Sequence, residues 1–133
     1  MSTNKAYFRV WQSGIDEAYL PKLAKAGLGG GVKQLEKRPG KPLRKPETHW
    51  ESDVVEWHGV FDEAPLRSIA ANLIVALRRI GRPDDLNVAL HIEIQVDRDL
   101  PHTGVPMSPN TLRLLGDLDA TLDIDIVPDL SPP

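Results

Sequence analysis

Two histidines of this chain lie beside carboxylates in stretches where polar and apolar residues alternate. His91 and Glu93 lie two residues apart in NVALHIEIQVD, and His49 belongs to the stretch THWESDVV. Residues two apart share one face of a β-strand, so His91 and Glu93 could share an ion or bind a basic group. Neither histidine belongs to a fuller motif such as His-Glu-x-x-His. These residues therefore indicate a binding surface without an identifiable reaction.

Other arrangements that often carry chemistry are incomplete. The aspartates at 117, 119, 123 and 125 lack the glycine and terminal glutamate of an EF-hand loop. The glycine-rich segment 27–31 follows a predicted helix and is not succeeded by Gly-Lys-Ser/Thr, so it does not match a phosphate-binding loop. No serine lies in a Gly-x-Ser-x-Gly elbow, and cysteine is absent. We accordingly predict no catalytic residue, no metal and no cofactor.

Length, charge and hydropathy limit the class of protein. A chain of 133 residues is long enough to bury a core, and we expect a single domain over 1–133. The absence of cysteine suits a reducing cytoplasm, and no apolar run approaches the roughly 18 residues of a membrane span. The net charge of −3 gives no electrostatic case for nucleic acid. We expect a cytoplasmic protein that does not contact membranes.

The most regular pattern in the chain is the alternation over residues 87–97. Five apolar residues point one way, and polar residues occupy most positions between them: Val88, Leu90, Ile92, Ile94 and Val96 against Ala89, His91, Glu93, Gln95 and Asp97. A strand buried on both faces would be apolar throughout. This strand is therefore expected to bury one face and leave the other open.

Shorter patterns predict the elements around this strand. The pattern of 6–12 is typical of a strand, and a helix should run from Asp16 to about residue 25, or begin nearer Pro21. Apolar residues at helical spacing predict a long helix over 62–80. Ser108-Pro109 should begin another helix, and 121–127 should form a last strand. The residues expected to face the core in these last two elements are Leu112, Leu115, Leu118, Leu122, Ile124 and Ile126.

A basic segment separates the first helix from the next strand, in which Trp50 and Val54 should face the core. Residues 28–47 are rich in glycine, proline and cations, and Pro39-Gly40 predicts a turn. Residues 32–55 form either a hairpin with a long basic tip or an irregular loop before one strand. The cations of 33–45 could contact an acidic protein, including a second copy of this chain, which leaves a homodimer open. No aromatic residue is interleaved for base stacking, so nucleic acid is not favoured. The tail 128–133 is expected to be flexible.

The order of these elements indicates an α+β fold. Half-polar strands disfavour a parallel sheet covered on both faces. We expect a two-layer sandwich, with a mainly antiparallel sheet of four or five strands and three helices on one face. A ferredoxin-like core with an extra helix and strand would account for this order.

Several segments together resemble a bacterial family, the domain of unknown function 4279. The matching segments are an early strand and helix, a His-Trp pair opening the next strand, the long amphipathic helix, and a final helix and strand: FRVWQSGIDEAYLPKLAKAGL, HW, 62–80 and SPNTLRLLGDLDATLDIDIV. The resemblance covers nearly the whole chain, apart from the basic insert 33–45. It implies a small α+β protein and no established activity. Some uncharacterised families of this size neutralise toxins, which is an analogy only.

The outward residues of the predicted strands define the candidate site. We expect a protein partner, in the manner of an inhibitor or immunity protein, to bind an open acidic face made of Tyr7, Arg9, Trp11, His49, Glu51, His91, Glu93, Asp123 and Asp125. One alternative is that these residues are only solvated, as a one-sided sheet requires. Another is a small-ligand or hydrolytic site around His49, His91 and Glu93.

Overall fold

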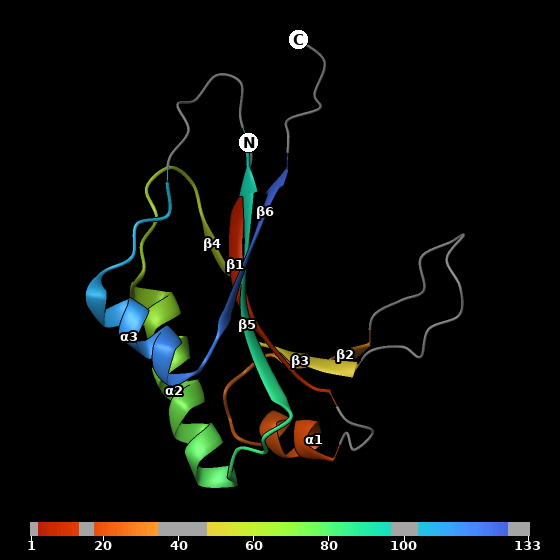
Figure 1. Ribbon diagram of the computed structural model, residues 1–133. Helices are drawn as coiled ribbons and strands as arrows, with labels where there is room; N and C mark the ends of the chain where they lie inside the picture. The colour runs from red at the N-terminus through yellow and green to blue at the C-terminus, as the bar shows by residue number, and fades with distance from the viewer. Residues whose placement is uncertain (1–2, 14–17, 35–47, 97–103, 128–133) are drawn as a thin grey trace.

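The computed structural model describes residues 3–13, 18–34, 48–96 and 104–127 (Figure 1). Six strands and three helices follow one another along the chain: β1 (Asn4–Gln12), α1 (Tyr19–Ala24), β2 (Gly31–Gln34), β3 (Thr48–Glu51), β4 (Val55–Trp57), α2 (Ala64–Ile80), β5 (Leu86–Gln95), α3 (Pro109–Asp117) and β6 (Thr121–Val127). The predicted cap at Asp16, the basic tip 35–47 and the tail 128–133 lie outside the described residues. No described helix is long and apolar enough to cross a membrane.

All six strands join in one mixed sheet. The order is β2-β3-β1-β5-β6, and β4 pairs with β1 beyond the end of β3. β1 is antiparallel to β5 over eight residue pairs, whereas β6 runs parallel to β5. β2 and β3 pair as an antiparallel hairpin, which confirms the strands of the predicted hairpin. The α+β class is therefore confirmed, and the sheet has one strand more than expected because a bulge divides β3 from β4.

The bulge changes which residues of 52–54 face the core. β3 places Trp50 opposite Val10, whereas β4 places Val55 opposite Ala6, so the paired positions shift by one residue between the two strands. Ser52 occupies the gap. Its backbone N–H donates to the carbonyl of Phe8 at 2.9 Å, and the N–H of Phe8 donates to the Ser52 hydroxyl at 2.9 Å. The prediction that Val54 faces the core is wrong, and Val55 is buried in its place.

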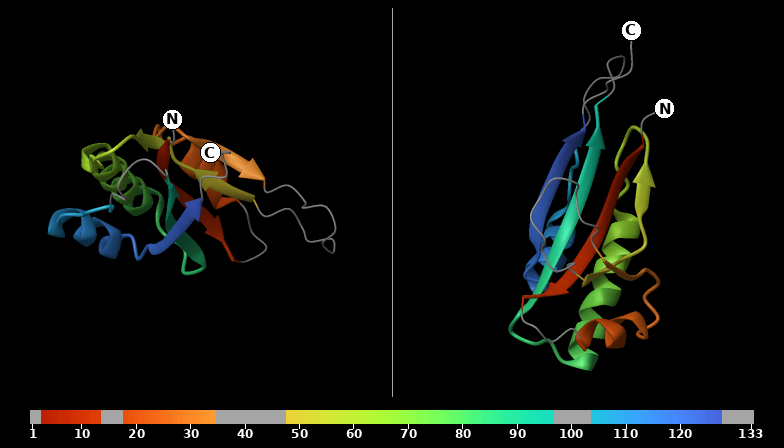
Figure 2. Two further views of the ribbon diagram at one scale, coloured as in Figure 1. Left: turned by 90° about the horizontal axis from the view of Figure 1, so that it is seen from above. Right: turned by 90° about the vertical axis from the view of Figure 1, so that its right-hand side faces the viewer.

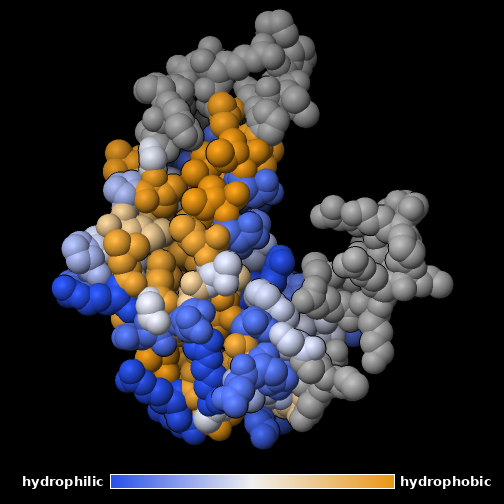
Figure 3. Space-filling model, in the orientation of Figure 1, coloured by the Kyte–Doolittle hydropathy of each residue, from blue (hydrophilic) through white to orange (hydrophobic). Residues whose placement is uncertain are grey.

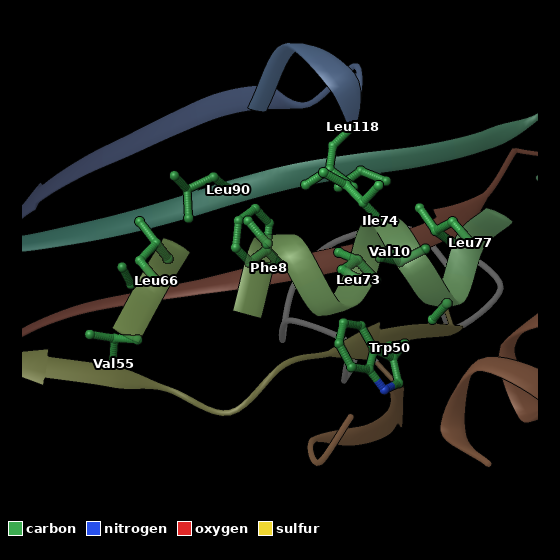
Figure 4. Packing of buried hydrophobic residues seen from close by; sticks show 14 of the residues in the cluster. Phe8, Val10, Trp50, Val55, Leu66, Leu73, Ile74, Leu77, Leu90 and Leu118 are labelled. Carbon is green, nitrogen blue, oxygen red and sulfur yellow. The ribbon is translucent and has the colours of Figure 1, made fainter. Parts of the chain in front are cut away.

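The three helices form one layer on the sheet. α2 contacts both α1 and α3 (Figure 1, Figure 2). Its apolar stripe, which includes Leu66, Leu73 and Leu77, packs against Phe8 and Leu90 of the central strands (Figure 4). Each such buried side chain contributes about 1.5–3 kcal/mol. The predicted helix over 62–80 and its core-facing stripe are thus confirmed.

The start of α3 is also as predicted, and its buried face is predicted in part, since Leu115 and Leu118 pack against the core as expected. The Ser108 hydroxyl accepts a hydrogen bond from the N–H of Thr111 at 3.4 Å, and Pro109 follows as the first helical residue. The N–H of Ser108 donates to the Glu63 carboxylate at 2.8 Å, which lowers the pKa of Glu63 and joins the starts of α2 and α3. Thr111 and Leu118 are buried, whereas Leu112 is exposed, so the prediction that Leu112 faces the core is wrong.

The apolar side of β6 is the largest departure from expectation. Leu122, Ile124 and Ile126 were expected in the core, yet 51%, 50% and 57% of their surface is exposed. They are in register with the buried Leu90, Ile92 and Ile94, so they lie on the helical side of the sheet. Apolar residues gather along this side of β6 (Figure 3). The described helices cover the centre of the sheet and leave its last strand half exposed.

The glycines after α1 pack against the end of β3 and the residues that follow it. Gly29 and Gly30 adopt φ values of +74° and +67°, which side chains disfavour. A Cβ on Gly30 would lie 2.0 Å from the carbonyl oxygen of Glu51. The N–H of Gly30 donates to the Asp53 carboxylate at 2.9 Å. This segment therefore docks directly on the bulge between β3 and β4.

Candidate functional site

The face of the sheet turned away from the helices carries most of the predicted site. Tyr7, Arg9 and Trp11 alternate along β1 with the buried core residues of that strand. Tyr7 lies opposite His91, and His91 and Glu93 lie beside Asp123 and Asp125 of β6. No described helix covers this face. The expected arrangement, with one covered and one uncovered face, is present in the described part of the chain.

Seven side chains on this face make a continuous series of contacts across the sheet. We call them the polar belt, and its members in order from β2 to β6 are Lys33, His49, Glu51, Arg9, Tyr7, His91 and Asp123. The series begins on one edge strand and ends on the other. It links residues 90 positions apart in sequence, from Lys33 to Asp123.

Glu51 is the acceptor at the β3 end of the polar belt. Its carboxylate lies 2.9 Å from the Lys33 ammonium, 2.8 Å from Nε2 of His49 and 3.8 Å from the guanidinium of Arg9. Because a carboxylate only accepts, the Nε2–H of His49 donates. Partial burial acts to raise the pKa of Glu51, but the hydrogen bonds from His49 and Lys33 outweigh it and hold the pKa below its ordinary value of 4.5. Glu51 is thus ionised at neutral pH and fully engaged.

The centre of the belt is an aromatic contact between β1 and β5. The Arg9 guanidinium donates to the Tyr7 hydroxyl at 3.2 Å and lies 5.9 Å from the centre of its ring. The rings of Tyr7 and His91 lie 5.0 Å apart at 40°. Burial raises the pKa of the Tyr7 hydroxyl above 10.0, so the phenol stays neutral and accepts from Arg9. These contacts hold three side chains in fixed positions on an otherwise uncovered surface.

The β6 end of the face differs because, among the described residues, its carboxylates have fewer close cationic partners than Glu51 has. Nδ1 of His91 lies 3.1 Å from the Asp123 carboxylate, whose side chain is 61% exposed. Glu93 and Asp125 are neighbours across the β5–β6 pair. Among the described residues, neither of these two carboxylates has an ion-pair partner within 4.0 Å. The charges of the β3 end are balanced locally, whereas those of the β6 end face solvent.

His49 does not take the position expected of a binding residue. It lies on the open face as expected, beside Glu51, but only 1% of its surface is exposed, so it is enclosed there and not available to a partner. Its Nε2 is occupied by Glu51, and its Nδ1 is buried without a hydrogen-bond partner among the described residues. Since the ring is enclosed, His49 positions Glu51 instead of contacting a ligand. Trp11 is partly buried, and Arg9 is similarly only partly exposed.

The three residues of the predicted small-ligand site are not brought together. His91 lies opposite Tyr7, and Glu51 lies opposite Arg9, with His49 two residues further along β3. The two histidines are therefore offset by four residues along β1, or about 13 Å. In the part of the chain that the structure describes, no three His, Asp or Glu side chains are grouped closely enough to hold a metal ion.

A hollow lies elsewhere, between α2 and α3. It has a volume of about 210 Å³ and is lined by Ile74, Leu77, Arg78, Arg82, Asp117 and Leu118. None of the predicted site residues contributes to it. Arg82 donates to the carbonyls of Leu118 and Leu86, so its guanidinium is engaged in holding the end of α2 to α3 and β5. The hollow therefore does not support the predicted ligand site.

Lys33 is the member of the polar belt that the sequence did not single out. It was grouped with the basic segment 33–45, most of which lies outside the described residues. The hairpin register places it opposite His49, next to Glu51. The alternation of polar and apolar residues in β2 and β3 indicated that they could pair. It could not show that Lys33 would lie opposite His49.

A scan against protein-family models, and searches of curated proteins and of solved structures, find no match to this chain. The resemblance to the domain of unknown function 4279 family remains a prediction.

Proposed function

We propose that this protein is a non-catalytic interaction module that binds a basic surface of another protein through the β6 end of its open sheet face. The binding residues at that end are Glu93, Asp123 and Asp125, and the polar belt holds their surroundings rigid. Trp11 lies on the same face but six residues along β1 from Lys5, the residue opposite Glu93, so it would contact a separate part of an extended partner surface. The proposed role is that of an inhibitor or immunity-type partner.

One observation carries this proposal. Glu93 and Asp125 are adjacent carboxylates on neighbouring strands, and no described cation lies within 4.0 Å of either, although Lys5 of β1 is opposite Glu93 in the register. Like charges placed side by side on a sheet reduce stability. The opposite end of the same face has Lys33 and Arg9 beside Glu51. A basic partner would neutralise the carboxylates at the β6 end, as Lys33 and Arg9 already do for Glu51 at the β3 end.

The rigid belt favours binding over solvation alone. A surface whose side chains are already fixed loses less conformational entropy when a partner docks. Tyr7, Arg9 and His91 are held by mutual contacts, and Trp11 adds a partly exposed aromatic group of the kind that often anchors interfaces.

A pull-down from the source organism tests the proposal. Immobilised wild-type protein is compared with Trp11→Ala and Glu93→Lys, and with Arg79→Glu as a charge-changing control on the exposed side of α2. We expect a specific partner with wild type and the control, and a loss of that partner with the two face variants. Equal recovery by all four proteins, or no specific partner, would reject the proposal.

We also propose that β1, β2, β3 and β5 with α1 and α2 form a ferredoxin-like core, to which α3 and β6 are appended. The support is that β5, β1, β3 and β2 are neighbours in that order and each adjacent pair is antiparallel. Membership of the domain of unknown function 4279 family is proposed on the sequence resemblance alone.

A further inference from the structure

The outer edge of β6 is the starting point for a second inference, which rests on the proposed function and concerns how the partner binds. β6 is the last strand in the sheet order, so one side of its backbone has no neighbouring strand in the described chain. Such edges are templates for pairing with another extended segment. Folded proteins commonly block them with proline, a bulge or charged side chains. Residues 121–127 contain no proline and no bulge, and their charges, Asp123 and Asp125, are both negative and would repel an acidic segment only.

The hydrogen bonds identify which backbone groups face outward. The carbonyl of Val127 accepts from the N–H of Val96, so Val127 bonds toward β5. In a strand, N–H and C=O of one residue point to the same side, and successive residues alternate. Asp123 and Asp125 therefore also bond toward β5, and the outward groups belong to Leu122, Ile124 and Ile126.

The side chains of β6 define what would pair with this edge. On the helical side, Leu122, Ile124 and Ile126 are each about half exposed. On the other side, Asp123 and Asp125 continue the acidic end of the open face, next to Glu93. A strand added beside β6 would extend both the apolar row and the acidic face. It needs apolar side chains on one face and basic side chains on the other.

Charge disfavours a second copy of the chain as the occupant. An antiparallel pair of β6 strands centred on Ile124 would place each Asp123 opposite an Asp125, on the side that already carries Glu93. Like charges directly opposite one another are destabilising. The edge is therefore complementary to a different sequence.

We propose that β6 binds its partner by strand addition, taking up an extended segment in which lysine or arginine alternates with aliphatic residues. The segment pairs with the outward backbone groups of Leu122, Ile124 and Ile126. Its aliphatic side chains cover the exposed apolar row of β6, and its cations lie against Asp123 and Asp125.

Synthetic peptides test this proposal without altering the protein. A labelled seven-residue peptide in which lysine alternates with valine is titrated with the wild-type chain by fluorescence anisotropy. The controls are the same peptide with glutamate in place of lysine, and a peptide of equal composition with its lysines grouped together. We expect the alternating basic peptide to bind at least about tenfold more tightly than either control.

Backbone methylation of the peptide separates strand pairing from simple charge attraction. Methyl groups on the amide nitrogens of one edge should weaken binding more than about tenfold, and the same number on the other edge should change it less than about twofold. Equal effects from both edges would reject strand addition. No binding of the basic peptide at millimolar concentration would reject it as well.

Protein variants locate the site on β6. Asp123→Asn and Asp125→Asn should each weaken peptide binding about threefold, and together about tenfold. Ile124→Pro removes an outward N–H without removing a bond to β5 and should abolish binding. Circular dichroism verifies that Ile124→Pro is folded. If it is not, the comparison of the two methylated peptides tests strand addition with the wild-type protein.

The outcomes distinguish this inference from the proposed function. If the partner recovered by pull-down is lost with Trp11→Ala but retained with folded Ile124→Pro, the open face is the binding site and strand addition is wrong. Concentration-dependent self-association in sedimentation, abolished by Ile124→Pro, would instead identify a second copy as the occupant and overturn the proposal.

Discussion

Replacement of Glu51 by glutamine is the sharpest test of the polar belt. Glu51 accepts from the buried His49 at 2.8 Å and from the exposed Lys33 at 2.9 Å. Hydrogen bonds to charged groups contribute about 1.5–3 kcal/mol, against about 1 kcal/mol for neutral ones, and exposed ion pairs contribute about 0–1 kcal/mol. The amide oxygen of the introduced glutamine can retain one neutral bond to His49. The free energy of unfolding should therefore fall by about 1–2 kcal/mol at neutral pH.

The difference between the two proteins should depend on pH. The folded-state pKa of Glu51 lies below its ordinary value of 4.5, because the bonds from His49 and Lys33 outweigh the effect of burial. A depressed carboxyl pKa stabilises the fold fully above the unfolded-state pKa, and this contribution is lost as the pH falls through the folded-state pKa. The wild-type advantage should thus be constant at neutral pH and shrink below about pH 4.5.

Urea unfolding followed by circular dichroism measures both effects. The matched control is Glu56→Gln, the same substitution at an exposed position of β4, which should change stability by less than about 0.5 kcal/mol. A loss for Glu51→Gln as small as that of the control would refute the assigned role of Glu51. A difference that did not shrink in acid would contradict the reasoning about its pKa.

The same assay checks three further expectations. Gly30→Ala should lower the free energy of unfolding by about 1–3 kcal/mol more than Gly27→Ala, because both positions have positive φ but only Gly30 would press a Cβ against a backbone carbonyl; equal losses would contradict this. Ser52→Ala should cost about 1–3 kcal/mol, since the buried N–H of Phe8 loses its acceptor; a neutral result would mean that the bulge is held by other contacts. Leu118→Ala should cost about 2–5 kcal/mol, whereas Leu112→Ala should cost less than about 1 kcal/mol, and a comparably large loss for both would restore the original assignment of Leu112 to the core face of α3.

The sequence predicts the local faces of the central elements well, for a physical reason. β1, α2 and β5 lie at the centre of the sandwich, where one side of each element is covered along most of its length. Burial there follows the period of the element, so the pattern of Leu66, Leu73, Leu90 and Ile92 was sufficient to assign their faces.

The same hydrophobic patterns do not predict burial at the edges of the sheet, because burial there depends on whether a helix extends over the edge strand. The alternation of Leu122 and Ile124 predicts a buried face, but whether helices extend over the last strand depends on the tertiary arrangement. The bulge at Ser52 depends on a contact with Phe8, which is 44 positions away. A two-residue period contains no signal for a residue that interrupts it.

The candidate site was predictable in its membership and not in its connections. Alternation placed Tyr7, His91 and Asp123 on one face, but the contacts among them require the register of three strands. The burial of His49 depends on the same kind of information. Register is fixed by turns and core packing, which single-sequence patterns do not specify.

Photo-crosslinking in cells of the source organism tests the central claim, that the open sheet face is a protein-binding surface, most directly. Benzoylphenylalanine is placed at position 95, on the open face beside Glu93, and in a second protein at position 75, an exposed site on the outer side of α2. We expect one specific crosslinked protein from position 95 and none from position 75. Specific crosslinks from position 75 alone would contradict it.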